Sequence, residues 1–188
     1  RDGNIWFATN GGAQKYDGLR WTTYTTEDGL AHNLILNINQ TKDGAIWIGT
    51  GSGAPNLSAG MTRLVEASDG GRAEVKADTF DGGGYGDGFL EAADGSIWIN
   101  LRDNTPLLDD TPDQSNNMRR YVNEVWQTVD QPMQTFGQII QDREGAIWTG
   151  TLNGMTLRFD GERWTQFQLS QDTTRNDSNY NRVYLDAS

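Results

Sequence analysis

Few residues of this chain are of the types that carry out covalent chemistry. The sequence contains no cysteine and a single histidine, His32, which excludes disulfides, thiolate metal sites and cysteine nucleophiles. His32 follows Gly29-Leu-Ala in a loop segment and precedes Asn33. Because no serine or cysteine motif accompanies this histidine, we interpret it as a loop residue that could contact a ligand rather than as a general base.

Carboxylates are plentiful, with 26 Asp and Glu among 188 residues, but their order matches no established site. Asp78, Asp81 and Asp87 stand among glycines in a way that could wrap a Ca²⁺, yet the segment lacks the regular spacing and closing Glu of an EF-hand. Glycoside hydrolysis would need two carboxylates at a fixed separation, and the sequence pairs no two of them. We therefore expect no resident cofactor, with calcium at those three aspartates as the alternative.

The charge balance restricts the class of partner. The 15 Lys and Arg against 26 Asp and Glu give a formal net charge of −11, which disfavours attraction to nucleic acid or to anionic membranes. No apolar run approaches the ~18 residues that a membrane-spanning helix needs. Seven tryptophans and an aromatic content of 10% are unlike the composition of disordered chains. The aromatic content therefore indicates a folded chain. The negative charge leaves other protein chains as the expected partners.

The elements that must position these residues come from a repeat. The pattern acid-Gly-x-Ile-Trp occurs four times, beginning at Asp2, Asp43, Asp94 and Glu144, and the copies lie about 40 to 50 residues apart. In each copy the acid-Gly pair favours a tight turn capped by the acid, with the glycine at positive φ. The Ile-Trp segment that follows is β-prone and alternates in the manner of a strand. Each copy thus predicts a hairpin.

Further strands surround each signature strand. An apolar run precedes the turn, as at Leu34–Ile38, and two more strand patterns follow, as at Ala13–Tyr16 and Arg20–Tyr24. In the third unit we assign Tyr121–Trp126 to one outer strand. Four short antiparallel strands in about 40 to 50 residues correspond to one blade of a β-propeller. The signature tryptophans hold the same place in every unit, so we expect core packing between blades rather than a ligand cage. They are Trp6, Trp47, Trp98 and Trp148.

The two ends of the sequence predict how a ring would close. Arg182–Ser188 resembles a first strand with no signature after it, whereas Arg1–Thr9 is a signature with no first strand before it. If the two ends are joined, Leu185 lies five positions before the turn acid Asp2. Each of the three complete copies has an apolar residue at that position. We predict one all-β domain over 1–188, a β-propeller of four blades with four antiparallel strands each, with part of a larger propeller as the alternative. The repeat units span about 1–32, 33–84, 85–134 and 135–181, with 182–188 closing onto 1–9.

These segments resemble the two-component regulator propeller repeat. Thr41–Thr50 is close to that family's pattern, and so is Tyr16–Leu30, which ends in the Asp28-Gly-Leu that leads into the next blade. The resemblance covers the whole chain, most strongly in the first and fourth copies. It implies a β-propeller of the kind found in periplasmic or extracellular sensor regions of bacterial histidine kinases, often as rings of about seven blades.

Binding residues are expected where the chain does not repeat, because insertions in repeat proteins often form the binding face. Tyr and Arg in such loops suit protein contacts. The candidates are His32, Asn33, Tyr85, Arg102, Asp103, Arg119, Arg120, Asn153 and Tyr180.

The sequence therefore predicts a non-enzymatic binding or interaction module, with no catalytic residue and no metal ligand assigned. It would be a rigid scaffold for protein contact or ligand sensing, as a sensor part or accessory subunit of a larger membrane-associated assembly. We expect a periplasmic or extracellular location, no nucleic-acid partner and no membrane span. The alternative is a lyase or hydrolase that acts on polysaccharide at a loop face.

Overall fold

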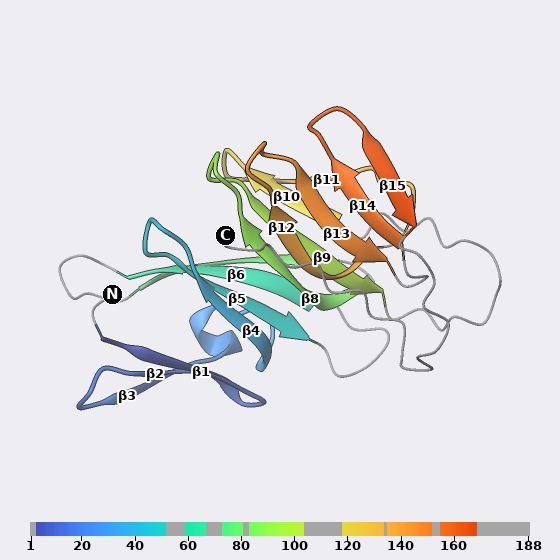
Figure 1. Ribbon diagram of the computed structural model, residues 1–188. Coiled ribbons are helices and arrows are strands. Elements are labelled where there is room, and N and C mark those ends of the chain that lie inside the picture. Colours follow the sequence, from blue (N-terminus) through green and yellow to red (C-terminus); the bar gives the residue numbers. More distant parts are fainter. Residues whose placement is uncertain are drawn as a thin grey trace, which may run out of the picture. The chain divides into compact units, whose positions relative to one another are not determined.

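The computed structural model describes residues 3–51, 59–66, 73–80, 83–103, 118–133, 135–151 and 155–168. Within them the chain forms fifteen β-strands and one short 3₁₀ turn, and the strands make four antiparallel sheets (Figure 1). The prediction of an all-β chain built from repeated strand units is confirmed. Three of the sheets have four strands, and the described part of the first sheet has three.

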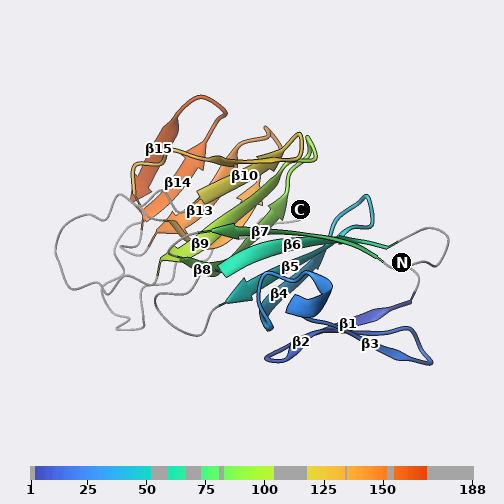
Figure 2. The ribbon, with the colours of Figure 1, turned by 180° about the vertical axis from the view of Figure 1, so that it is seen from behind.

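The chain divides into two compact units, of which the first covers 1–85 and 103–106 and holds sheets A and B. Sheet A consists of β1 (Ile5–Thr9), β2 (Gly12–Tyr16) and β3 (Trp21–Tyr24), in that order. Sheet B consists of β4 (Leu34–Gln40), β5 (Ile46–Gly51), β6 (Ala59–Val65) and β7 (Glu74–Phe80). The 3₁₀ turn η1 (Thr26–Asp28) connects the two sheets. It lies between them in both ribbon views (Figures 1 and 2).

The second unit covers 86–102 and 107–188 and holds sheets C and D, apart from the outer ends of β8 and β9. Sheet C consists of β8 (Gly83–Glu91), β9 (Ile97–Asp103), β10 (Met118–Val122) and β11 (Val125–Thr128). Sheet D consists of β12 (Thr135–Gln141), β13 (Ile147–Thr151), β14 (Met155–Phe159) and β15 (Trp164–Gln168). Strands that are consecutive in sequence are neighbours in every sheet, as in the blades of a propeller.

The signature hairpins form as predicted in sheets B, C and D. In sheet A the described residues include the turn glycine but no strand before it. The signature glycines have positive φ, the conformation that glycine adopts without strain. The angles are 77° at Gly3, 90° at Gly44, 81° at Gly95 and 90° at Gly145. In the second copy Asp43 Oδ1 accepts a hydrogen bond from the N–H of Ala45 at 3.0 Å, so the acid caps its turn as expected.

The fourth copy corrects the prediction that Glu144 caps its turn. Asp142 takes that role, because its Oδ1 accepts hydrogen bonds from the N–H groups of Glu144 at 3.0 Å and Ala146 at 2.9 Å. Its Oδ2 accepts from the indole Nε1 of Trp148 at 2.6 Å. A carboxylate two residues earlier in the chain therefore reaches the same turn and also holds the signature tryptophan.

The prediction of a single outer strand over Tyr121–Trp126 is wrong. The chain turns back at Asn123 and Glu124, whose φ angles are 51° and 63°, and Tyr121 pairs with Trp126 across this turn. Two successive positive φ angles give the turn type that matches the twist of a hairpin. Because neither residue is glycine, the turn carries only a weak signal in the sequence.

Sheets A and B pack through side chains at repeat positions. Ile46, Ile48 and Leu64 of sheet B are buried in one cluster with Ala13 of sheet A, and Trp6 packs partly buried against it. This cluster forms the hydrophobic core of the first unit.

Sheets C and D pack in the same way. Ile147 of sheet D is buried with Trp98 and Met118 of sheet C. The exposed fraction is 4% for Trp98 and 3% for Trp47 in the first unit, so the expectation that the signature tryptophans are core residues is confirmed for these two.

A buried amide connects sheets C and D. Asn100 stands where two other signature copies have glycine, and it is 2% exposed. Its Nδ2 donates to the carbonyl of Gly137 at 3.2 Å, and its Oδ1 accepts from Thr135 Oγ1 at 2.8 Å. Because buried polar groups are costly unless they are hydrogen-bonded, this network favours one register between the two sheets.

The predicted closing strand Arg182–Ser188 lies outside the described residues, so the pairing of Leu185 beside Ile5 stays a prediction. Over the part of the chain that the structure describes, no helix has the length and apolar character needed to cross a membrane.

Candidate functional site

Each signature tryptophan of sheets B, C and D lies beside an arginine from the neighbouring strand. The cross-strand pairs are Trp47 with Arg63, Trp98 with Arg120, and Trp148 with Arg158. The guanidinium carbon lies 5.9, 5.2 and 5.8 Å from the respective ring centroid, which is within cation–π range. The same arginines reach the turn acids, Arg63 to Asp43 at 2.9 Å, Arg120 to Asp94 at 2.6 Å and Arg158 to Glu144 at 3.1 Å. We call each set an Arg–Trp–acid clamp.

In sheets B and C the turn acids of the clamps have lowered pKa values. Partial burial raises the pKa of Asp43, but hydrogen bonds from Thr41, the Ala45 N–H and Arg63 outweigh it and hold the pKa below its usual value. The pKa of Asp94 is lowered in the same way, against burial, by Ser96 and Arg120. A general acid for glycoside hydrolysis needs the opposite, a raised pKa. These acids therefore have a structural role.

Sheet A departs from the clamp pattern. Lys15 stands opposite Trp6, in place of the arginine, and its Nζ forms an ion pair with Glu66, which follows β6 of sheet B. Lys15 therefore links sheet A to sheet B. The acid of this first copy, Asp2, lies outside the described residues.

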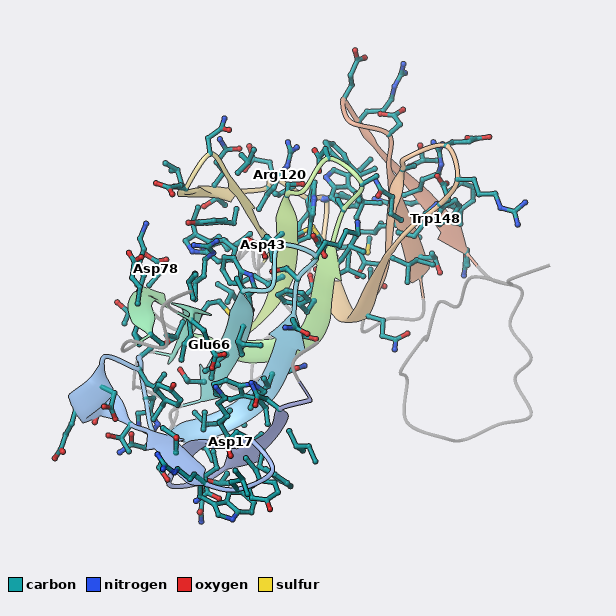
Figure 3. All side chains as sticks on the ribbon, turned by 90° about the vertical axis from the view of Figure 1, so that its left-hand side faces the viewer. Asp17, Asp43, Glu66, Asp78, Arg120 and Trp148 are labelled. Atoms are coloured by element: carbon teal, nitrogen blue, oxygen red, sulfur yellow. The ribbon has the colours of Figure 1, made fainter. Side chains whose placement is uncertain are left out.

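A groove of about 490 Å³ opens beside this ion pair, within the first unit. Side chains from β1, from the β4–β5 hairpin and from the end of β6 line it. They include Asn4, Trp6, Gln40, Asp43, Val65 and Glu66, and Figure 3 labels Asp43 and Glu66. The lining is a mixture of apolar and hydrogen-bonding side chains.

The opposite side of sheet A is apolar and exposed. Strand alternation and register place Ile5, Phe7, Tyr16 and Trp21 on this side, which we call the front face of sheet A. The exposed fractions are 53% for Ile5, 40% for Phe7 and 58% for Trp21. The Trp21 ring stacks on Tyr16 at 4.9 Å and lies 5.2 Å from Phe7. Contiguous exposed apolar patches of this kind mark interaction sites.

In sheets B and D the side chains at the corresponding repeat positions are buried or half-buried. Ile46 and Leu64 of sheet B correspond to Ile5 and Tyr16 by register, and their exposed fractions are 4% and 0%. In the second unit Trp164 corresponds to Trp21, is half-buried, and donates its indole N–H to a main-chain carbonyl at 2.7 Å. The front face therefore has the composition of a contact between sheets but is exposed to solvent.

The predicted loop residues His32 and Asn33 are half-buried and hold the turn that precedes β4. His32 Nδ1 accepts a hydrogen bond from the N–H of Leu34 at 3.0 Å, and Asn33 Oδ1 accepts from the N–H of Thr26 at 2.8 Å. Neither residue lines the groove. These contacts give both side chains a local structural role.

The other predicted site residues do not come together within the described part of the chain. Arg120 belongs to a clamp, and the half-buried Arg119 donates from Nη1 to the carbonyl of Met118 at 3.1 Å. Burial lowers the pKa of the Arg119 guanidinium. The backbone of Tyr85 lies in β8 and that of Arg102 and Asp103 in β9, but the structure does not describe their side chains. Asn153 and Tyr180 lie outside the described residues.

No group of three His, Asp or Glu side chains within the described ranges is arranged to hold a metal ion. Of the three aspartates considered for calcium, Asp78 lies in β7 and Asp81 is outside the described residues. Asp87 lies in β8, where its side chain is not described. The calcium alternative therefore stays a prediction.

Comparisons with known proteins identify the repeat. Residues 29–52 match the family model described as two component regulator propeller, and this segment contains the second signature copy, Asp43–Thr50. This segment therefore matches the repeat that the signature segments resemble. A comparison with curated protein sequences finds no match.

Two solved structures share the fold. The extracellular domain of BT4673 from B. thetaiotaomicron, which is named as a hybrid two component system, aligns with 95% of this chain and 22% of its own, at 18% identity and a TM-score of 0.63. PorZ is named as an essential bacterial surface component of the type-IX secretion system of Porphyromonas gingivalis. It aligns with 88% of this chain and 26% of its own, at 12% identity and a TM-score of 0.57. The architecture is that of a β-propeller, and the chain spans about a quarter of the length of these proteins.

Proposed function

We propose that this chain is a non-catalytic interaction module, a propeller segment of a larger bacterial surface protein, and that it contacts another protein through the front face of sheet A. The exposure of Ile5, Phe7 and Trp21 carries the proposal, because sheet B buries Ile46 and Ile48 at the positions of Ile5 and Phe7, and Trp164 is half-buried at the position of Trp21. Tyr, Trp and Phe are enriched at protein interfaces, and buried Trp and Tyr side chains often dominate their energetics.

Two observations support the non-catalytic part of the proposal. The clamps use the turn acids Asp43 and Asp94 for structure and keep their pKa values low. His32 uses its Nδ1 to hold a turn. Both observations favour binding over hydrolysis.

The similar structures support the setting. One is an extracellular domain and the other a bacterial surface component, and both are much longer than this chain. They support the proposal that the module works outside the cytoplasm, in a larger assembly attached to the cell envelope.

Site-specific photo-cross-linking tests the proposal. The chain with p-benzoylphenylalanine in place of Trp21 is irradiated with the envelope fraction of its native bacterium, and a discrete protein adduct is expected. The same group in place of Glu162, an exposed residue at the β14–β15 turn, is the matched control and should give none. Equal cross-linking from both positions, or release of reducing ends from envelope polysaccharide by the unmodified chain, would contradict the proposal.

A further inference from the structure

A buried polar network joins sheets C and D at a place where other copies of the repeat are small or apolar. Asn100 stands at the position that holds Gly49 in sheet B and Gly150 in sheet D. It is 2% exposed, and the exposed fractions of Thr135 and Thr149, both in sheet D, are 0%. Because a lone polar side chain is costly to bury, the polar groups of the two sheets must match one another.

The network uses both ends of the Asn100 amide. Beside its bonds with the Gly137 carbonyl at 3.2 Å and the Thr135 hydroxyl at 2.8 Å, its Nδ2 lies 3.4 Å from Oγ1 of Thr149. An asparagine amide has two N–H donors, and both are directed at sheet D. The partners lie on β12 and β13, so one side chain of sheet C contacts two neighbouring strands of sheet D.

The main chains of the two sheets approach closely at this network. A Cβ at Gly88 of β8 would lie 2.5 Å from the carbonyl oxygen of Gly137 and 2.9 Å from Nδ2 of Asn100. A shift of sheet D by one residue along its strands would move each of its groups by about 3.3 Å. Such a shift would break the hydrogen bonds of the network, so the network permits only one register.

The corresponding position in the first unit has the opposite character. Ile48 holds the place of Thr149, and it is 0% exposed in an apolar cluster with Ala13 and Leu30. A sheet with isoleucine at this place would leave the Asn100 amide with fewer partners. A sheet with glycine at the place of Asn100 would leave the buried threonine hydroxyls of sheet D without theirs. Each unpaired buried group lowers the population of the mismatched arrangement about tenfold or more.

We propose that the Asn100 network selects sheet D as the neighbour of sheet C and fixes a single register between the two sheets. The signature isoleucine and tryptophan do not make this selection, because they recur in all four copies. A buried polar contact makes it by penalising every arrangement in which its groups are unpaired. Asn100, Thr135 and Thr149 are therefore specificity-determining residues of the fold, and this role is independent of any partner protein.

A chain that carries Asn100→Leu, Thr135→Val and Thr149→Val together tests the proposal, because it replaces the network by apolar side chains of similar size. It should recover at least about half of the decrease in urea midpoint that Asn100→Leu alone causes, since the threonine hydroxyls are no longer left unpaired. Its ¹H–¹⁵N spectrum should show a second set of amide signals for sheets C and D, with about a tenth of the intensity or more. Sheets A and B should keep one set.

The matched control is Thr62→Val, the same change at a buried threonine outside the network. Thr62 is 0% exposed, and its Oγ1 accepts a hydrogen bond from the N–H of Ala31 at 3.2 Å. This variant should have a lower urea midpoint and one set of signals. A second set in the control would overturn the inference, because heterogeneity would then follow from the loss of any buried hydroxyl.

One set of signals from the triple variant would also overturn the inference, because an apolar contact would then select neighbour and register equally well. If the triple variant does not fold, the Asn100→Gly chain decides the question, because it gives sheet C the residue that sheets B and D have at this position. A second set of signals from sheets C and D of that chain would support the selection, and a single set would overturn it.

Discussion

Two isoleucines at the same repeat position should respond differently to truncation. Ile46 begins β5 and is 4% exposed, whereas Ile5 begins β1 and is 53% exposed. Truncating a buried isoleucine to alanine costs ~2–5 kcal/mol, because apolar contacts are lost and a cavity remains. At Ile5 about half of the side chain is already in water and little cavity can form, so we expect a cost of about 1 kcal/mol or less. Both residues lie in the first compact unit, so one unfolding transition reports on both.

Urea unfolding followed by tryptophan fluorescence measures this difference. The Ile46→Ala chain should lose at least about 1 kcal/mol more than the Ile5→Ala chain at similar m-values. Its melting temperature should fall by about 2–4 °C for each kcal/mol. Equal costs would refute the reasoning, because they would mean that the front face of sheet A is covered in the folded chain. The contact surface proposed for the partner would then not exist.

The clamps and the buried amide allow three further tests by urea unfolding. Arg63→Gln removes a cation–π contact and an ion pair and should cost about 1 kcal/mol of stability. The control is Arg163→Gln, because the Arg163 side chain is 78% exposed and its loss should change stability by less than about 0.5 kcal/mol. Equal costs for the two variants would contradict a stabilising role of the clamp. Folding lowers the pKa values of Asp43 and Asp94, so their contribution is present above the unfolded value of about 3.9 and is lost as the pH falls through the lowered folded values. The urea midpoint should therefore decrease as the pH falls below about 5, and in an Arg63→Gln chain it should decrease less. Asn100→Leu leaves buried partners without their hydrogen bonds and should cost ~1–3 kcal/mol; an unchanged or raised midpoint would show that the network contributes nothing.

Repetition made most of the fold predictable. The turn at Gly44 and the buried position of Trp47 follow from local chemistry that recurs in every copy, so one correct assignment predicts the others. The two errors have local causes. The Asn123–Glu124 turn uses positive φ without glycine, and Asp142 replaces Glu144 as the cap because a carboxylate two residues earlier reaches the same N–H groups.

The candidate surface could not be predicted in the same way. Loops were the expected location, yet His32 and Asn33 use their side chains to hold a turn. Ile5 and Ile46 are identical in type and in repeat position, and a tryptophan follows each of them. Only the packing of another sheet distinguishes them, and no local pattern in the sequence encodes that.

This difference changes where function should be sought in a repeat protein. The residues that make a sheet stack on its neighbour are apolar, aromatic and ordered, which are also the properties of an interface core. Trp164 and Trp21 hold the same repeat position and illustrate the point. Trp164 is half-buried and donates its indole N–H to the main-chain carbonyl of Asp130, whereas Trp21 is 58% exposed. A repeat whose stacking face is exposed therefore presents a preformed half of an interface without any specialised residue. The partner that fits it must supply what the neighbouring sheet supplies elsewhere, namely apolar side chains that pack on this face.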